Sequence, residues 1–512
     1  MSEGPAPGSR ASAAAAGAVA AGVALGVGEL LAGLLPGAPS PIIAIGGLVI
    51  DLQPPGAKDF VVGLFGTADK LALQLVVVTA VLVIGAGLGL LARRRFGVAA
   101  AILVGFAAVG FVAGLRDPDA ISTLAAVSSA ASAGAGVVSL SWLLATIGVR
   151  SPTGELPRPF DWSRRGLLVR GGALAIGSIA AGAFGRSLLE GARRTPEETA
   201  LPAATAAPPP AAGAELDVDG LSPLVVPNRD FYLIDTTLIP PNVDRASWRL
   251  RVHGMVEREV ELDYDELIAL GPFEQYVTIA CVSNLVGGDL IGNAKWTGVR
   301  LRDVLAMAGV QPTATQLVGR SVDGWTAGMP TAWVLDPARE PMIAVGMNDE
   351  PLPREHGYPA RLIVPGLYGY VSATKWVTEL ELTTLEAFDA YWVPLGWAKE
   401  APVLTQSRID VPRNGANLAP GTVTIAGVAW AMDRGVGRVE VSIDGEWHDA
   451  TLATPISSTT WVQWRFDWPA TSGGHEIAVR ATDGTGQVQT AERSRPDPDG
   501  ARGHHTIRVN VA

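Results

Sequence analysis

The chain has 512 residues, of which 48% are hydrophobic, so it is long enough for about three domains, and its single cysteine cannot form an internal disulfide. Residues 1–195 hold 15 Lys and Arg against 10 Asp and Glu (net +5), which leaves 24 against 40 (net −16) for residues 196–512 and restores the total of −11. Phosphate backbones are bound by clustered Lys and Arg, so this acidic globular part excludes nucleic acid as an expected partner.

The first 190 residues are predicted to form a transmembrane domain. Their long stretches with few or no charged residues each approach the ~20 residues that cross a bilayer core. These five expected spans cover about residues 12–35, 71–92, 97–115, 120–147 and 166–185. A shorter apolar stretch, SPIIAIGGLVIDL (40–52), is interpreted as interfacial or re-entrant. Buried helices of a soluble protein are the alternative.

The arginines predict how this domain is oriented. Three of them, RRR at 93–95, follow the second expected span, and four more lie between residues 150 and 165, after the fourth. Because cytoplasmic loops are enriched in Lys and Arg, these loops and the N-terminus are expected inside, and all residues after the fifth span outside. The prediction is a multi-pass protein of the cell membrane with an extracytoplasmic globular part.

Glu29 is an acidic residue inside the first expected span. An ionisable residue in a membrane span is a functional-site hypothesis by default. Glu29 is, however, close to the expected outer end of the span, where water can reach it, so a structural role is favoured.

The fifth span begins with the sequence DWSRRGLLVRGG (161–172). Paired arginines followed by a moderately apolar span and an exported domain resemble a twin-arginine translocation signal. The alternative is that Arg164 and Arg165 only enforce the orientation of the span. The distinction has a functional meaning, because the twin-arginine route exports folded proteins, including those that receive a cofactor before export.

Residues 191–215 are rich in Pro and Ala and predict an extended linker. From 216 to 390, strand-like runs alternate with short helical segments, which indicates an α+β domain. From 395 to 512 the pattern is β only, because apolar and polar residues alternate between glycine-rich turns. That spacing is typical of an antiparallel sandwich of immunoglobulin type. The exported part is therefore expected to hold two domains.

Cys281, in TIACVSNLVGG (278–288), is the one cysteine of the chain. A free cysteine is most often a small buried hydrophobic residue, and from this stretch alone that interpretation is favoured. The two alternatives are a nucleophile and a single thiolate that binds a soft metal.

Four separate stretches of the exported part resemble the sulfite oxidase family of molybdenum enzymes, in the family's order. They are CVSNLVGGDLIGNAKWTGVRLRDVLAMAGV (281–310), SVDGWTAGMP (321–330), MNDEPLPREHGYPARLIVPGLYGYVSATKWV (347–377) and VGRVEVSIDGEWHDATL (436–452). A fifth stretch, NRDFY (228–232), resembles the opening segment of the membrane-anchored bacterial branch. The resemblance implies a molybdopterin-binding domain followed by an immunoglobulin-like domain that often mediates dimerisation, so a homodimer is one expected assembly.

The resemblance also implies roles for individual residues. Cys281 is expected to bind molybdenum as the catalytic thiolate, because the dithiolene sulfurs of molybdopterin and one protein sulfur complete a soft ligand set. Arg361 is expected to contact the cofactor, because a planar guanidinium suits a phosphate. The full set of implied cofactor contacts is Asn228, Phe231, Tyr232, Ser321, His356, Arg361, Ser372, Ala373, Thr374 and Lys375. For His356, a purely structural turn residue is the alternative.

This chain departs from the vertebrate pattern beside the expected metal. Vertebrate-type sulfite oxidases carry arginines that bind the oxyanion at the two places where this chain reads LV (285–286) and VS (371–372). We therefore expect two-electron or oxygen-atom transfer on a small, less charged molecule, as in the sulfoxide-reducing bacterial branch, and not on sulfite itself. The alternative is a non-catalytic envelope binding protein that keeps the fold without the metal. The joint presence of Cys281, Arg361 and Lys375 favours the enzyme.

The electrons are expected to come from, or go to, a partner outside this chain. All six histidines lie within residues 253–505, after the fifth expected span, so the membrane domain cannot supply two histidine ligands to a haem b. A single cysteine also excludes the C-x-x-C-H site of a c-type haem. We expect molybdenum without haem, and a separate electron-transfer protein or a quinone as the partner.

Overall fold

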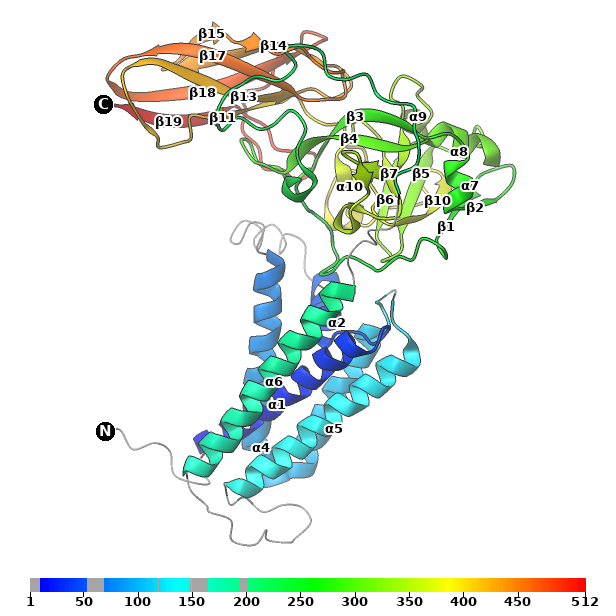
Figure 1. The fold of residues 1–512 in the computed structure, drawn as a ribbon, viewed down its shortest axis with the longest axis vertical. Helices are drawn as coiled ribbons and strands as arrows, with labels where there is room; N and C mark the ends of the chain where they lie inside the picture. The colour runs from blue at the N-terminus through cyan, green and yellow to red at the C-terminus, as the bar shows by residue number, and fades with distance from the viewer. Residues whose placement is uncertain (1–9, 53–68, 118, 148, 150–163, 193–199) are drawn as a thin grey trace. The chain divides into compact units, whose positions relative to one another are not determined.

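The structure is a computed structural model that describes all residues except 1–9, 53–68, 118, 148, 150–163 and 193–199 (Figure 1). By its internal contacts the chain divides into two compact units. The first, the helical unit, consists of Met1–Arg194 and Thr236–Asn242, and the second, the β-rich unit, consists of Thr195–Asp235 and Val243–Ala512.

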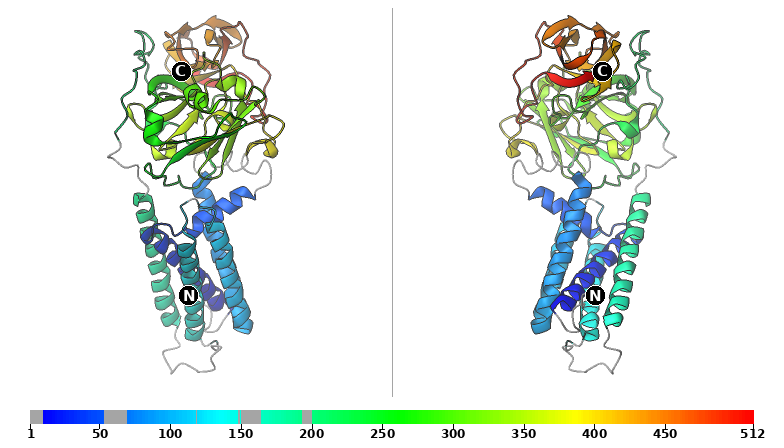
Figure 2. Two further views of the ribbon diagram at one scale, coloured as in Figure 1. Left: turned by 90° about the vertical axis from the view of Figure 1, so that its right-hand side faces the viewer. Right: turned by 90° about the vertical axis from the view of Figure 1, so that its left-hand side faces the viewer.

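The helical unit is a bundle of apolar helices, in which α1 runs obliquely to the longer ones (Figure 2). Its helices are α1 (Arg10–Leu34), α2 (Pro41–Asp51), α4 (Asp69–Gly114), α5 (Ser122–Thr146) and α6 (Arg164–Ala192). Within the described residues, all of these except α2 are long and apolar enough to cross a membrane. The short helix α2 covers most of the stretch expected to be interfacial; Ser40 is its N-cap and Pro41 opens its first turn.

The prediction of five separate helices is wrong in its count, because the described residues contain four helices of spanning length, one of which holds two expected spans. The second and third expected spans, 71–92 and 97–115, lie in the single helix α4, whose backbone leaves the helical region at Arg95 (φ −143°, ψ 69°). The connecting residues RRRFG (93–97) include no proline that would keep helical structure from resuming directly after the break.

The two arms of α4 nevertheless run in opposite directions. Gly85 packs against Ala21, and Gly89, one turn later, packs against the earlier residue Ala13, so the first arm is antiparallel to α1. Gly114, the last residue of α4, packs just beyond the end of α1. The chain has therefore turned back at the break, and each arm keeps the length of one expected span.

The first domain of the β-rich unit has two sheets and short helices, which confirms the expected α+β class. One sheet has the order β2-β1-β10-β5-β6, and the other has the order β3-β4-β7-β8 with β9 paired to β7. The strands are β1 (Arg249–Gly254), β2 (Val260–Asp263), β3 (Phe273–Ala280), β4 (Ile291–Arg300), β5 (Gln316–Ser321), β6 (Thr326–Pro330), β7 (Met342–Met347), β8 (Glu350–Pro351), β9 (Arg361–Ile363) and β10 (Val377–Thr383). The helices are α7 (Tyr264–Ile268), α8 (Leu301–Ala308), α9 (Thr331–Val334) and α10 (Gly369–Ser372).

The second domain is all β, which confirms the expected immunoglobulin-like class. Its two sheets, yellow-gold to red in Figure 1, have the orders β11-β13-β17-β16 and β12-β19-β18-β14-β15. The strands are β11 (Gln406–Val411), β12 (Asn417–Leu418), β13 (Gly421–Trp430), β14 (Val436–Ile443), β15 (Glu446–Asp449), β16 (Thr451–Leu452), β17 (Val462–Ala470), β18 (Gly473–Asp483) and β19 (His505–Val511). Alternate residues of β18, such as Ile477 and Val479, are fully buried and pack with Trp464 of the facing sheet.

The two domains of the β-rich unit share part of their core. Trp461, just before β17, is 1% exposed and packs with the core of the first domain. Its indole Nε1 donates to the carbonyl of Leu224 (2.9 Å), and its backbone N donates to Oγ1 of Thr278 in β3 (2.8 Å). The strand that carries Cys281 at its end is therefore fixed from the second domain as well as from the first.

Of the predicted linker, residues 191–215, the structure describes 191–192 and 200–215; the first two residues are not linker but the end of α6. Thr205 pairs with Phe273 at the start of β3, and the backbone N of Ala207 donates to the carboxylate of Glu274 (3.2 Å). This part of the linker is extended and lies along the edge of the sheet that leads to Cys281.

Candidate cofactor site

Cys281 begins the connection between β3 and β4, residues 281–290, which we call the Cys loop. Its backbone N donates to the carbonyl of Leu290 (2.9 Å), and the Oδ1 of Asn284 accepts from the N of Leu290 (2.9 Å). Asn284, three residues after the cysteine, thus closes the loop. The Sγ of Cys281 lies 2.9 Å from the Oγ of Ser283, and the residue is 9% exposed. The sequence places one largely shielded thiol at the end of a buried strand.

The immunoglobulin-like domain braces the Cys loop from outside. Nη1 of Arg408, in β11, donates to the carbonyl of Gly288 (2.7 Å), and its Nε pairs with Asp410 (2.6 Å). His505 lies against Gly287, whose φ of +80° and lack of a side chain leave room for the imidazole ring. The sequence did not predict this contact, because no local signal relates residue 288 to residue 408.

Phe231 of the NRDFY stretch lies at the centre of an aromatic cluster. Its ring stacks on Tyr232 (5.3 Å between centroids) and meets the rings of Trp296 (5.9 Å) and His356 (5.6 Å) edge-on. Gly292 in β4 makes this possible, because a Cβ there would lie 2.6 Å from the Phe231 ring. The Asn and aromatic residues expected at the cofactor are thus brought against the strand that follows the Cys loop.

The pKa of Tyr232 is affected by both the cysteine and the arginine of the expected site. Burial raises the pKa of its phenol, the nearby Cys281 sulfur raises it further, and Arg361 acts in the opposite direction. Burial also raises the pKa of Tyr368, and Cys281 contributes there too. Both phenols are therefore held neutral within electrostatic range of the thiol, and the phenol oxygen of Tyr368 accepts from the backbone N of Leu404 (3.4 Å).

His356 is buried and neutral. It ends the 3₁₀ turn Arg354–His356, and its Nε2 lies 2.9 Å from the backbone carbonyl of Asn228. A carbonyl only accepts, so Nε2 carries the proton and Nδ1 is the acceptor. Burial lowers the pKa of His356 to about 3, and the cations of Lys375 and Arg361 act in the same direction. The site therefore presents an imidazole acceptor rather than a cation at this position.

Arg361 is a buried cation at the start of β9. It is 4% exposed, its Nη1 donates to the carbonyl of His356 (3.0 Å), and its guanidinium lies 5.0 Å from the centre of the Trp296 indole. Burial lowers the pKa of Arg361 to about 10, so it remains charged at neutral pH. Its Nε is buried and has no hydrogen-bond partner among the described residues. An anionic or polar acceptor would satisfy this group.

Two carboxylates lie beside Lys375, and sequence analysis missed both. Asp235 Oδ2 accepts from Lys375 Nζ (2.9 Å), and both side chains are nearly buried. Burial raises the pKa of Asp323, and the nearby Asp235 raises it further, whereas Ser321 and Lys375 lower it. The signal was available, because Asp235 follows NRDFY by three residues and Asp323 lies inside SVDGWTAGMP.

The polar side chains of Asn228 and Ser372 are used within the fold. Nδ2 of Asn228 donates to the carbonyl of Met347 and to the carboxylate of Glu350 (both 3.1 Å). The Ser372 hydroxyl donates back into the preceding turn, to the carbonyls of Leu367 (3.1 Å) and Tyr368 (3.0 Å). Both residues hold the backbone of the site, and their hydrogen-bond donors are already used.

The remaining expected contacts are buried around α10 and β5. The side chain of Thr374 packs against Gly319 of β5, Ala373 is 8% exposed at the end of α10, and Ser321 is buried at the end of β5 beside Asp323. Cys281 and Arg361 both affect the pKa of Tyr232, and Arg361 and Lys375 both affect the pKa of His356. These five residues therefore lie in one region of the domain. No group of three or more His, Cys, Asp or Glu side chains with metal-site geometry occurs in the described part of the chain.

Comparison with known protein families matches both domains of the β-rich unit. Residues 237–392 match the model of the oxidoreductase molybdopterin binding domain, and residues 406–509 match a bacterial Ig domain. Among solved structures, the sulfane dehydrogenase SoxCD from Paracoccus pantotrophus aligns with a TM-score of 0.50 and 25% identity, over 57% of this chain and 84% of that one.

Several curated proteins are similar over the same half of the chain. Human mitochondrial sulfite oxidase is 31% identical over 316 residues, 52% of this chain and 57% of that protein. Sulfite oxidase of Gallus gallus is 31% identical over 314 residues, 52% of this chain and 68% of that protein. The rice nitrate reductase [NADH] 1 is 28% identical over 49% of this chain and 34% of its own length. The chain spans a little over half the length of the mitochondrial relatives.

Proposed function

Because this chain belongs to the sulfite oxidase family of molybdopterin-dependent oxidoreductases, we propose that it is a membrane-anchored enzyme that transfers two electrons, with an oxygen atom, to or from a small molecule. The observation that carries the proposal is the pairing of a shielded thiol, Cys281, with a buried guanidinium, Arg361, whose Nε lacks a protein partner among the described residues. Tyr232 lies within electrostatic range of both groups.

The side chains present fit Mo-molybdopterin. A buried cation with an unused N–H group suits the anionic part of the cofactor, and the imidazole Nδ1 of His356 and the carboxylate of Asp323 suit the N–H groups of a pterin. Lys375 adds a second cation. When bound, the cofactor supplies two dithiolene sulfurs to molybdenum and, through the metal, the two-electron chemistry.

The residues of the chain would then have separate tasks. Cys281 would supply the protein thiolate to the metal, with its position set by the closed Cys loop. Tyr232 and Tyr368, both within electrostatic range of that sulfur, would stay neutral and add no charge to its surroundings. The aromatic cluster around Phe231 would exclude water from the pterin side of the site.

Apolar residues at positions 285 and 371, where vertebrate-type sulfite oxidases carry arginine, support a substrate that carries little charge. Positions 285 and 371 are Leu and Val; Leu285 is 62% exposed at the tip of the Cys loop, and Val371 is buried. An apolar rim of this kind favours a neutral oxygen donor or acceptor, such as a sulfoxide, over sulfite or nitrate. A substrate screen that compares sulfoxides with sulfite tests this part of the proposal.

The positions of the arginines support an extracytoplasmic site. The cluster at 93–95 lies at the break between the two arms of α4, and the arginines between 150 and 165 lead into the first turn of α6. The β-rich unit would therefore lie on the side opposite to them. The N-terminus would lie on the cytoplasmic side, and α1, α4, α5 and α6 would anchor the enzyme in the cell membrane.

Metal analysis tests the proposal directly. Purified full-length protein should contain about one molybdenum per chain, because one thiolate completes one soft site. Cys281→Ser should lower turnover by more than about 100-fold, the loss that even outer-shell changes at metal sites reach, while the far-ultraviolet circular dichroism stays unchanged.

Ser283→Ala is the matched control, because it removes the hydroxyl next to Sγ but leaves the thiol. It should retain molybdenum and most of the activity. Wild-type protein that remains active from cells grown without molybdenum would contradict the proposal. Folded protein that never contains molybdenum would instead favour the non-catalytic binding protein.

A further inference from the structure

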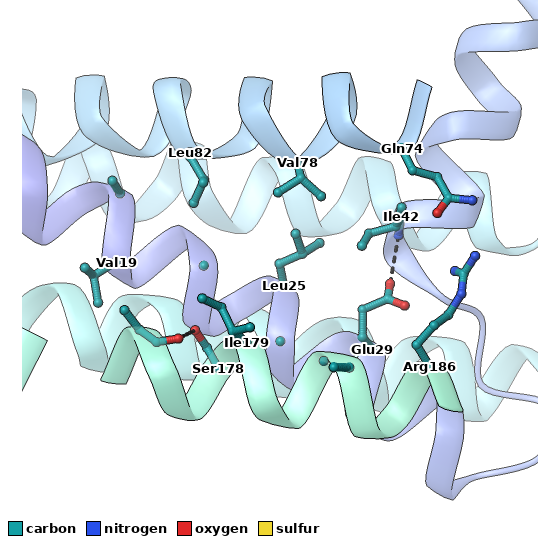
Figure 3. A pocket seen from close by; sticks show the side chains of 16 residues that line it. Val19, Leu25, Glu29, Ile42, Gln74, Val78, Leu82, Ser178, Ile179 and Arg186 are labelled. Carbon is teal, nitrogen blue, oxygen red and sulfur yellow. Dashed lines mark hydrogen bonds between the residues drawn. The ribbon is translucent and has the colours of Figure 1, made fainter. Parts of the chain in front are cut away.

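The helical unit contains a cavity of about 460 Å³ that the chemistry proposed above does not use. It lies between α1, α4 and α6, and one end is polar and the rest is apolar (Figure 3). Glu29, Gln74 and Arg186 lie at the polar end, and residues such as Leu25 and Val78 line the remainder. A volume of this size suits a small-molecule ligand. Because one end of the cavity is polar and the remainder is apolar, that ligand should be amphipathic.

Among the residues that line this cavity, Glu29 is the one that indicates ligand binding. It is 2% exposed, and its Oε1 accepts from the hydroxyl of Ser40 (2.6 Å) and from the backbone N of Ile42 (3.0 Å). Its Oε2 is buried and has no hydrogen-bond partner among the described residues. A buried carboxyl oxygen without a partner is costly, so a ligand that supplies the missing hydrogen bond would be favoured.

The chemistry of a carboxyl group narrows the class of ligand. An ionised Oε2 accepts a hydrogen bond from a hydroxyl, and a protonated one donates to a carbonyl. A quinol and its quinone present these two groups on the same ring position. The phosphate of a phospholipid would suit Arg186, but it would repel an ionised Glu29 and has no hydrogen to donate to Oε2, and an acyl chain would also leave Oε2 without a partner.

The exposure of residues that line the cavity supports a ligand that enters from the lipid phase. Ile179 and Leu82, which line it, are 71% and 37% exposed on helices of membrane-spanning length and composition. A ring could therefore lie at Glu29 while an isoprenoid tail leaves between α4 and α6 toward lipid.

We propose that this cavity binds the head group of a lipid-soluble quinol or quinone, with Oε2 of Glu29 as its hydrogen-bond partner. The inference rests on the proposed function, because an enzyme that exchanges two electrons needs a partner that supplies or accepts them, and a quinol can reach helices of membrane-spanning length from the lipid. Quinols carry two electrons and two protons, which matches one turnover.

The test uses full-length protein in lipid nanodiscs and a fluorescent quinol analogue, heptyl-hydroxyquinoline N-oxide, whose quenching reports binding. Wild-type protein should bind the probe saturably, and a short-chain quinone should displace it. Glu29→Leu should weaken binding by about tenfold or more, because a hydrogen bond to a buried charged or polar group is lost.

Gly22→Leu tests the cavity without touching Glu29. A Cβ at Gly22, which lines the cavity, would meet its nearest neighbours, Leu82 and Ser178, at ordinary distances of 3.6 and 3.8 Å, so the new side chain should occupy the ligand volume. Binding should again fall by about tenfold or more. Gly87→Leu is the matched control on α4, because nothing lies within 4 Å of its Cβ position, and binding should stay within about twofold of wild type.

Probe binding no greater than that of empty nanodiscs, or equal binding by all four proteins, would overturn the inference. Displacement by phospholipid but not by quinone would also overturn it. Molybdenum content, measured on the same samples, separates this inference from the proposed function. Protein with molybdenum but without probe binding contradicts only the quinone site, and probe binding without molybdenum contradicts only the proposed enzyme.

Discussion

His356 shows how its surroundings, rather than its residue type, decide what a side chain offers. Its sequence context, HGYPARL, allows either a turn residue or a cofactor contact. In the structure the 3₁₀ turn ends at His356, its ring faces the aromatic cluster and Asn228 fixes its tautomer, whereas the cofactor contact stays a prediction. Arg361, five residues later, keeps its charge in the same buried region, so the site combines one cation with one neutral acceptor.

The stability of the cofactor-free protein should depend on pH through His356. Above pH 6.5 the imidazole is neutral in both the folded and the unfolded chain, so it contributes no pH dependence. Between 6.5 and about 3 only the unfolded chain binds the proton, so folding stability is lost as the pH falls. The slope is at most about 1.4 kcal/mol per pH unit.

His356→Gln, whose amide can still donate to the carbonyl of Asn228, should make the urea midpoint of the β-rich unit less sensitive to pH in this window. His475→Gln is the control of opposite sign. The Asp444 carboxylate, 2.7 Å away, raises the pKa of His475, so this histidine adds stability below pH 6.5 that is lost as the pH rises. Parallel curves for wild type and His356→Gln would show that His356 is not buried as described.

At the scale of secondary structure, glycines set the distance between the helices. Gly33 of α1 and Gly185 of α6 face each other so closely that a Cβ on either would clash with the backbone of the other helix, and a Cβ on Gly26 would lie 2.5 Å from the carbonyl of Ser178. Small residues at helix crossings allow this approach in membrane proteins, where van der Waals packing replaces the hydrophobic effect. The same approach brings α6 against Glu29 and closes one wall of the cavity.

Gly185→Leu should therefore separate α1 from α6 and destabilise the helical unit by about 1–3 kcal/mol, the usual cost of overpacking. Thermal denaturation of the full-length protein in detergent would measure the change. Gly177→Leu, on the same helix, is the matched control, because nothing lies within 4 Å of its Cβ position. Equal midpoints for the two variants would contradict the close contact of these helices.

At the scale of the whole molecule, the chain joins a helical unit to a β-rich unit, and each unit has hydrophobic cores of its own. In the β-rich unit, the cofactor residues come from segments more than 100 residues apart, such as 228–232 and 356–375, so the site exists only after folding. A cofactor inserted before export would therefore require export of the folded unit, which is the reason to propose the twin-arginine route.

Replacing Arg164 and Arg165 together by lysine should block the appearance of the β-rich unit outside the cell. The change keeps the positive charge that orients α6 but removes the paired arginines of the proposed signal. Protease accessibility of the β-rich unit in spheroplasts would measure the effect. Replacing Arg93 and Arg94 by lysine is the matched control and should have no effect. Normal export of the Arg164 and Arg165 variant would show that these arginines act only on orientation.

Local patterns in the sequence determined much of this protein. Hydrophobic length predicted the membrane-type helices, alternation with glycine-rich turns predicted the β-sandwich, and four short stretches predicted the family that the comparisons show. These features are readable because each depends on residues close together in the chain. The residues implied by the resemblance, Cys281 and Arg361 above all, stay a prediction until metal and cofactor are measured.

Only the tertiary structure decided which side chains are free to act. It joined two expected spans into α4, used the donors of Asn228 and Ser372 within the fold, and set the tautomer of His356. It also placed Arg408 on the Cys loop and left one oxygen of Glu29 without a hydrogen-bond partner among the described residues. Hydrogen-bond satisfaction depends on groups that meet only after folding, often across more than 100 residues, so no local pattern contains it.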